Sequence, residues 1–324
     1  IGDYKYHERR GGLKALREEV ALIHSKQSRV MFYSFPQGCS IGTDTYKTVG
    51  KQLAKMDFPG HYQTSYTTDE SGYFLCDHNI GFSEYYAPKL AKIVKETDCD
   101  GFRLDVMSRF EPCFNPAHLH YDGTLRSTVS TTNLAKNLCN FKDAFHKVSP
   151  EKVVTVEHGA SDFLCQFHDG YFSENINWIS ESPQWANYRK LNAYMLVFTR
   201  FYFPEVKTWI HGPSNTELGI TMSLFNACGF ACTSSQGIRS FRTLEENGDA
   251  FDSDAENIPC IPTLVPGVFA NYFPGILRQK TIWTILNRSG QLVTRPLAIS
   301  TPEAECHFVE LYNDVDVNTI PNGE

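Results

Sequence analysis

Buried-strand patterns alternate with helices through the first half of this 324-residue chain. Short, mostly apolar runs, typical of parallel strands that are buried on both faces, occupy residues 29–35, 99–106 and 152–158. Helices are expected at 11–25, 83–97 and 131–147, the first because its apolar residues recur at helical spacing. This alternation predicts a parallel α/β fold, either a (β/α) barrel or a doubly wound sheet.

The segments after the strands decide between these two folds. Neither of the glycine-rich phosphate-binding patterns, GxGxxG and GxxxxGK[ST], occurs directly after any strand, which argues against a nucleotide-binding sheet. We therefore expect a (β/α)8 TIM-type barrel. A further strand at 205–212 and a short one ending the segment 215–234 bring the barrel strands to about five. Because the chain opens on a helix, we expect an upstream segment of the same polypeptide to complete the barrel.

The pattern changes near residue 264, where apolar and polar residues begin to alternate. Such residues precede and follow the turn at 287–290 and recur at 305–314. Alternation of this kind predicts antiparallel strands, most simply a small β-sandwich. We therefore expect two domains, a barrel over residues 1–262 and a C-terminal β-sandwich over residues 263–324.

Two of the predicted strands end in a carboxylate, Asp105 and Glu157. Barrel enzymes carry their chemistry at these strand ends, and two carboxylates about 5–5.5 Å apart suit a double displacement at an acetal carbon. Arg103 points the same way as Asp105, since side chains repeat every two residues, and would keep it ionised as a nucleophile requires. Apolar Val156 would help Glu157 to retain a proton, as an acid must. A purely structural ion pair between Arg103 and Asp105 is the alternative.

These two strand ends also carry a family resemblance. The segment DGFRLDV (100–106) resembles the fourth-strand motif of the α-amylase superfamily of glycoside hydrolases, and VVTVEHG (153–159) resembles the fifth-strand motif. The chain as a whole is similar to less characterised glycosidase-like barrel proteins with a C-terminal β domain. The resemblance implies that Asp105 is the nucleophile, Arg103 its partner and Glu157 the general acid/base. The third carboxylate of the superfamily has no match here.

Further side chains near the expected strand ends are candidates for substrate binding: Asp77, His78, His158, Trp178, Glu181 and His211. The first two would line the barrel mouth, although capping of a loop explains them as well. The tryptophan would stack on a sugar face or fill the core, and the two later histidines would contact a sugar hydroxyl or pack. Glu181 is the fallback acid if Glu157 is structural.

Charge and composition exclude several other classes. A net charge of −7 without a basic stretch argues against nucleic acid and anionic membranes as partners, and no apolar run reaches the roughly 20 residues of a membrane span. The ten cysteines form no CxxC pair, which argues against zinc. The acidic loop 249–257 lacks the glycine and terminal glutamate of a calcium-binding EF-hand. We therefore expect no metal site, and sugar hydrolysis needs no cofactor. The compartment stays open, secretion being one alternative.

The sequence thus predicts a retaining glycoside hydrolase that acts on an oligo- or polysaccharide. Asp105 attacks the anomeric carbon, and Glu157 protonates the leaving oxygen and then activates water. An alternative from another class is a carbohydrate-binding or structural barrel that has lost hydrolysis, which the missing third carboxylate favours. A transglycosidase, which shares the site and excludes water, is a third alternative.

Overall fold

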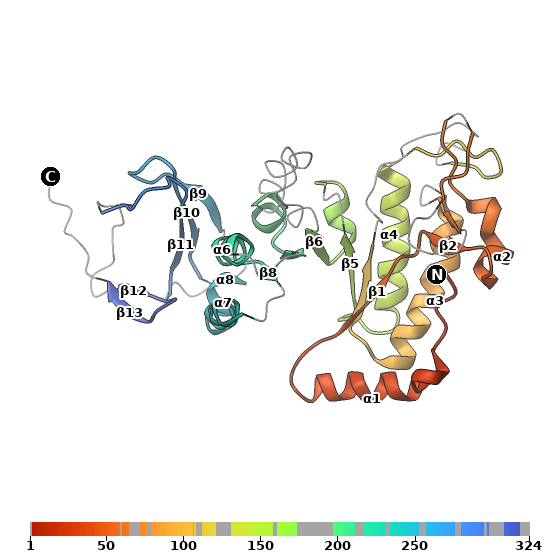
Figure 1. Ribbon diagram of the computed structural model, residues 1–324, viewed down its shortest axis with the longest axis horizontal. Helices are drawn as coiled ribbons and strands as arrows, with labels where there is room; N and C mark the ends of the chain where they lie inside the picture. Colours follow the sequence, from red (N-terminus) through yellow and green to blue (C-terminus); the bar gives the residue numbers. More distant parts are fainter. Residues whose placement is uncertain are drawn as a thin grey trace. The chain divides into compact units, whose positions relative to one another are not determined.

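The computed structural model of the chain describes most of its residues (Figure 1). These are 2–58, 60–64, 72–76, 79–105, 107, 112–120, 131–157, 161–173, 197–210, 217–230, 234–252, 257–275, 280–294, 297 and 308–317. The chain divides into two compact units, Ile1–Phe172 (unit 1) and Ser173–Glu324 (unit 2). Each is described by itself, and the domain boundary expected between residues 262 and 263 stays a prediction.

Unit 1 alternates helices with short strands, as the sequence predicts. Its helices are η1 (Glu8–Arg10), α1 (Gly12–His24), α2 (Asp44–Leu53), α3 (Ile80–Thr97), α4 (Thr131–His146) and η2 (Leu164–Phe167). Its strands are β1 (Met31–Ser34), β2 (Gly38–Ser40), β3 (Gly72–Phe74), β4 (Gly101–Leu104), β5 (Val153–Glu157) and β6 (Gly170–Ser173). The three strands predicted for this part of the chain are confirmed as β1, β4 and β5, and β6 was not predicted.

Four of these strands form a parallel sheet in the order β1-β4-β5-β6. The register pairs Tyr33 with Arg103, Arg103 with Thr155, and Glu157 with Phe172. Gly101 begins β4 with a φ of +155°, and a Cβ atom there would lie 1.9 Å from the carbonyl oxygen of Val153. Only glycine allows the two backbones to approach so closely, so this residue permits the pairing of β4 with β5.

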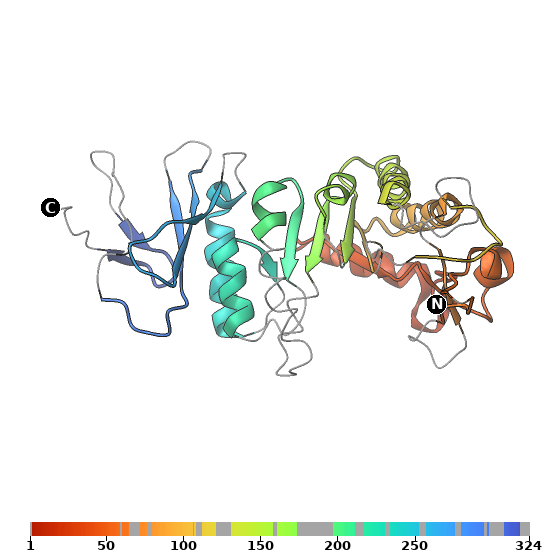
Figure 2. The same ribbon diagram turned by 90° about the horizontal axis from the view of Figure 1, so that it is seen from above.

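One face of this sheet is covered by α3 and α4, which lie side by side in Figures 1 and 2. The residues on that face, Phe102 and Leu104 of β4 with Val154 and Val156 of β5, are buried. The ring of Phe102 contacts that of Phe145 in α4, with centroids 5.8 Å apart. Because side chains alternate along a strand, Arg103 and Glu157 belong to the opposite face, away from the helices. In a (β/α) barrel that face is the interior.

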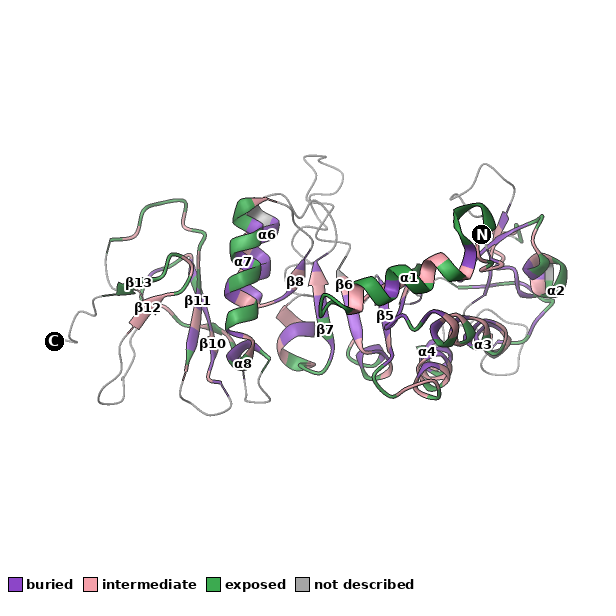
Figure 3. Ribbon diagram, turned by 90° about the horizontal axis from the view of Figure 1, so that it is seen from below, coloured by how far each residue is buried: buried purple, intermediate pink, exposed green. Residues whose placement is uncertain are grey.

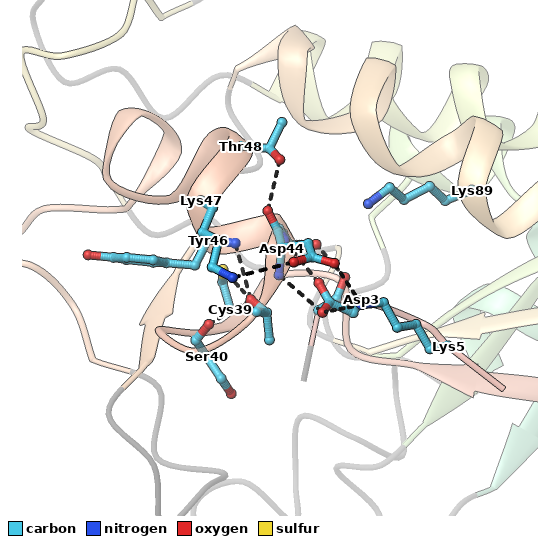
Figure 4. A network of polar contacts seen from close by, with 12 residues as sticks. Asp3, Lys5, Cys39, Ser40, Asp44, Tyr46, Lys47, Thr48 and Lys89 are labelled. Carbon is cyan, nitrogen blue, oxygen red and sulfur yellow. Dashed lines mark hydrogen bonds and ion pairs between the residues drawn. The ribbon is translucent and has the colours of Figure 1, made fainter. Parts of the chain in front are cut away.

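A small polar network fixes the start of α2 (Figure 4). Asp3 accepts hydrogen bonds from the backbone nitrogens of Asp44 and Thr45 at 3.1 and 2.9 Å, and Thr43 caps the helix by accepting from the nitrogen of Tyr46. Lys5 pairs with Asp44 at 2.6 Å. Backbone hydrogen bonds lower the pKa of Asp3 against the opposing effect of burial. These contacts satisfy the unpaired N–H groups of a helix end, so they serve the fold.

Unit 2 contains a parallel strand pair and antiparallel strands. Its elements are β7 (Lys207–Ile210), α6 (Glu217–Asn226), β8 (Gly229–Phe230), α7 (Ser235–Glu246), α8 (Gly248–Phe251), β9 (Ile258–Ile261), β10 (Val268–Phe273), β11 (Ile282–Asn287), β12 (Phe308–Glu310) and β13 (Val315–Val317). Residues 197–202 are also helical. Figure 3 shows an exposed and a buried stripe along α7, as expected of an amphipathic helix.

The sequence predictions for unit 2 are confirmed in part. Parallel β7 and β8 match the two later barrel strands. β9, β10 and β11 form an antiparallel sheet, and β12 pairs with β13. No strand follows the turn at 287–290 within the described residues 291–294, in contrast to the predicted alternation. The packing of two sheets into a β-sandwich stays a prediction. Among the described residues, no helix is long and apolar enough to span a membrane.

A buried histidine just before β6 makes the stability of unit 1 sensitive to acid. The side chain of His168 is 3% exposed, and burial lowers its pKa from 6.5 to about 4. The folded chain therefore favours the neutral histidine. Below pH 6.5 the unfolded chain binds a proton that the folded chain does not bind, so the free energy of unfolding falls with pH until the folded histidine is protonated as well, near pH 4. Between pH 7 and pH 4 this loss should reach about 3 kcal/mol.

Replacement of this group should remove its share of the acid sensitivity. We expect the free energy of unfolding of His168→Leu, measured in urea at several pH values, to fall about 3 kcal/mol less than that of the native chain between pH 7 and pH 4. His61→Gln, at an exposed histidine, serves as the control and should follow the native chain. Equal losses in His168→Leu and the native chain would contradict the prediction.

Candidate active site

The polar residues predicted at the strand ends meet on the face of the unit 1 sheet opposite α3 and α4. Arg103 lies on β4 and Glu157 ends β5, while Asp105 follows β4 directly. Continuation of the β4–β5 register beyond Leu104 and Val156 places Asp105 level with Glu157. Asp105 is two residues beyond Arg103, and Glu157 is two residues beyond Thr155, the partner of Arg103 on β5. Because side chains alternate along a strand, both carboxylates belong to the face of Arg103. The C-terminal ends of parallel strands are where barrel enzymes carry their chemistry.

Arg103 and Glu157 form a two-pronged ion pair between neighbouring strands. The Nε atom of Arg103 donates to Oε2 of Glu157 at 2.8 Å, and its Nη2 atom donates to Oε1. Glu157 is 1% exposed. The guanidinium carbon lies 5.4 Å from the ring centroid of Tyr33 and 4.8 Å from that of Phe172. Two hydrogen bonds and two aromatic neighbours hold the guanidinium in one orientation.

Asp105 is the more accessible of the two carboxylates. Its side chain is half-buried, and its Oδ2 atom accepts a hydrogen bond of 2.5 Å from the hydroxyl of Tyr33. Its backbone nitrogen donates to the carbonyl of Ser34 at 2.8 Å, which ties the end of β4 to the end of β1. Burial first, and then the hydrogen bond to Asp105, raises the pKa of Tyr33. The phenol therefore stays protonated and donates to the carboxyl group of Asp105.

This arrangement adds to the sequence prediction in one respect. Arg103 was expected to orient Asp105, and the structure shows it forked on Glu157. A phenol, that of Tyr33, donates to Asp105. The sequence does not reveal these two contacts, since both carboxylates lie on the same face as Arg103 and only the register places them. The catalytic roles of Asp105, Glu157 and Arg103 stay predictions.

The six candidates for substrate binding lie outside the described residues. They are Asp77, His78, His158, Trp178, Glu181 and His211. Tyr33 and Phe172 were not considered from the sequence. Tyr33 lies within the predicted strand 29–35, where its phenol could have been noticed. Phe172 belongs to β6, whose four residues follow η2 too closely to stand out as a strand.

A separate group of potential metal ligands lies elsewhere in unit 1. One ligand atom from each of four buried side chains lies within 4.8 Å of the others, and the residues are Cys76, Cys113, His118 and His120. Only cysteine pairs close in the sequence were considered in the argument against zinc. The spacing of Cys113, His118 and His120 within eight residues was the available signal.

Comparison with known proteins shows similarity at the level of structure. No protein-family model matches the sequence, and no curated protein matches it either. A GH36 α-galactosidase from Geobacillus stearothermophilus aligns with a TM-score of 0.59 and 9% identity over 99% of this chain and 46% of its own. The galactosidase domain of an α-galactosidase–sucrose kinase aligns with a TM-score of 0.58 and 10% identity, over 93% of this chain and 41% of that one.

An α-N-acetylgalactosaminidase from Bifidobacterium bifidum is also similar, with a TM-score of 0.54 and 11% identity over 85% of this chain and 45% of its own. This chain thus spans less than half the length of these three structures. At identities this low the likeness concerns the fold alone. The amylase superfamily stays a resemblance of two short motifs. The chain has an α/β fold with parallel strands, shared with glycoside hydrolases.

Proposed function

We propose that this chain is the barrel part of a retaining glycoside hydrolase that acts on an oligosaccharide. The observation that carries the proposal is Asp105, a half-buried carboxylate at the end of β4 with the Tyr33 phenol 2.5 Å away. The ion pair of Arg103 and Glu157 joins β4 to the neighbouring strand β5 beside it. The glycosidase-like fold supports the same reaction class.

Asp105 is the nucleophile in this proposal. Its carboxylate attacks the anomeric carbon, the bond to the leaving oxygen breaks, and a covalent glycosyl-enzyme forms. Water then attacks the same carbon and releases the carboxylate, so the anomeric configuration is retained. Tyr33 supports this role because its hydrogen bond stabilises the ionised carboxylate before attack. Once the carboxylate has bonded to the anomeric carbon, the Tyr33 hydroxyl can donate its hydrogen bond to the sugar ring instead.

The acid/base has two assignments that an experiment separates. Glu157 is the candidate from the sequence, but Arg103 donates two hydrogen bonds to it, and such bonds favour the ionised form over the protonated acid. If Glu157 instead positions Arg103, another carboxylate must serve as the acid/base. Glu181 is the fallback acid from the sequence, and Glu174 lies near it in the sequence.

Leaving-group dependence identifies the acid/base. A substrate whose leaving group departs without protonation should still form the glycosyl-enzyme in an acid/base variant, and added azide should then capture it. Glu157→Gln, Glu174→Gln and Glu181→Gln are to be compared on aryl glycosides with activated and unactivated leaving groups. The acid/base is the residue whose variant is rescued by azide only on substrates with an activated leaving group.

Related structures suggest which sugars to test first. One GH36 α-galactosidase structure is described as a complex with raffinose. The first substrates to test are therefore aryl α-galactosides and raffinose. Aryl α-glucosides and maltooligosaccharides complete this substrate panel because of the amylase-like motifs. We expect hydrolysis of at least one substrate, with NMR spectra showing that the first product keeps the anomeric configuration. Binding of these sugars without turnover of any would support the non-catalytic alternative. An excess of glycosyl transfer over hydrolysis would support the transglycosidase.

A further inference from the structure

Four buried side chains of the kinds that bind zinc meet at the edge of unit 1. They come from two segments, one at the end of the β3 region and the other at 113–120, and they are Cys76, Cys113, His118 and His120. Their ligand atoms all lie within 4.8 Å of one another. The Sγ atom of Cys113 and Nε2 of His118 are 3.5 Å apart. Two ligands of a tetrahedral zinc ion, one sulfur and one nitrogen, are separated by about 3.6 Å.

In the segment 113–120 polar side chains are buried and apolar ones are exposed, the reverse of the pattern that hydrophobic packing produces. Cys113, His118 and His120 are buried, whereas Phe114 between them is exposed and Leu119 is 54% exposed. Proteins usually bury leucine and phenylalanine and leave histidine exposed, so the burial of apolar side chains does not explain the conformation of this segment. A bound metal ion would account for polar side chains that point inward while their apolar neighbours point outward.

The two histidines are arranged as metal ligands usually are. Nδ1 of His118 lies 2.7 Å from the backbone carbonyl oxygen of Gln52, so it carries the proton and leaves the Nε2 lone pair directed at the cluster. The ring of His120 lies 4.8 Å from that of His118, centroid to centroid. Both ring nitrogens of His120 are buried, and neither has a hydrogen-bond partner among the described residues. An unpaired buried imidazole is costly unless a ligand satisfies it.

Two of the four ligand atoms are cysteine sulfurs, from Cys76 and Cys113. The thiolate is the form of cysteine that binds metals. Two thiolates would balance the charge of a divalent ion, and binding would release the thiol protons to solvent.

We propose that unit 1 holds one Zn²⁺ ion in a closed, structural site whose ligands are Cys76, Cys113, His118 and His120. Thiolate and imidazole together favour zinc over the hard cations calcium and magnesium. Inward movement of the ligand atoms by about 1 Å would complete a tetrahedron. Four protein ligands leave no open position for water or substrate, so the ion takes no part in sugar chemistry.

The site would fasten the chain that follows Asp105. Hydrogen bonds already join this segment to the end of α2 and the residues after it: Phe114 donates to Met56 at 2.8 Å, and Asn115 donates to Ala54 at 2.7 Å. Zinc would add a strong link between this segment and Cys76, which precedes α3. Residues 113–120, which lie between the nucleophile candidate and α4 in the sequence, would then be anchored.

Metal analysis of the native full-length chain tests the proposal. The protein is purified without chelators, dialysed against buffer containing a small excess of Zn²⁺ and then against metal-free buffer, and analysed by plasma mass spectrometry and by native mass spectrometry. We expect about one zinc ion per chain. Cobalt in place of zinc should give the intense visible bands of a tetrahedral site and a thiolate-to-cobalt absorption in the near ultraviolet.

Single substitutions locate the ligands. Cys113→Ser and His120→Asn should lower the zinc content at least about tenfold after dialysis, since loss of one of four ligands weakens a structural site strongly. Cys165→Ser is the matched control because Cys165 is also a buried cysteine of unit 1, and it should keep the zinc. If the ligand variants fail to fold, the thiolate-to-cobalt absorption of the native chain still decides.

Two results would overturn the proposal. One is a folded native chain that retains no stoichiometric zinc after dialysis and shows no thiolate-to-cobalt absorption. The other is a Cys76–Cys113 disulfide in the native protein, detected by peptide mass spectrometry without reduction. Neither result bears on glycoside hydrolysis, because the metal content is measured independently of activity.

Discussion

Asp105→Asn is expected to lower kcat/KM for glycoside hydrolysis at least about 10³-fold, because the covalent route loses its nucleophile. The amide has nearly the same shape as the carboxylate and can still accept the hydrogen bond from Tyr33, so the fold at the end of β4 should persist. Initial rates on the best substrate of the panel measure the effect. Addition of azide to the variant should produce a glycosyl azide of inverted configuration at the anomeric carbon, since a small anion can replace the missing carboxylate.

The matched control for this substitution lies at the other end of the same strand. Asp100 precedes β4, and its carboxylate accepts a hydrogen bond from the nitrogen of Val30 at 2.7 Å and pairs with His24 at 3.0 Å. Asp100→Asn removes one negative charge from the same strand but far from its C-terminal end. It is expected to lower stability and to leave the kcat/KM of the folded fraction within about threefold of the native value. If Asp105→Asn kept activity within the same range, the proposed nucleophile would be wrong.

The sequence predicts the strands that carry this chemistry because their apolar runs are long enough to be recognised. The strand at 99–106 ends in Asp105, and that at 152–158 includes Glu157, so both carboxylates could be placed at strand ends without the structure. β6 escaped recognition because its apolar run is only Tyr171 and Phe172, between Gly170 and Ser173. With β6 missing, Phe172 could not be related to the site.

The contacts of the site could not be predicted because they depend on register. Arg103 is two residues from Asp105 on its own strand, and Glu157 is on the next strand, so both carboxylates are within its reach on the same face. The observed pairing of Arg103 with Thr155 places Glu157 two residues further along β5, on the same face and within reach of the guanidinium. For the four potential metal ligands the difficulty is similar, since 36 residues separate Cys76 from Cys113.

Glu157→Gln is expected to lower the free energy of unfolding by about 3–5 kcal/mol, the largest stability effect that we predict for a single side chain. The carboxylate is 1% exposed, and its removal leaves the Arg103 guanidinium charged and half-buried with no carboxylate in the fork. Arg103→Met should cost a similar amount because it leaves Glu157 charged and buried. Urea unfolding at pH 7, followed by circular dichroism, measures both changes.

The double variant separates the cost of an unpaired charge from the value of the pair itself. Arg103→Met combined with Glu157→Gln leaves neither charge of the pair, so its loss should be far below the sum of the two single losses. Lys207→Met is the control, since it breaks an exposed ion pair with Asp252 of 2.8 Å and should cost at most about 1 kcal/mol. Additive losses in the double variant would show that the two side chains stabilise the sheet independently, and the assignment of Glu157 as the residue that positions Arg103 would then fail.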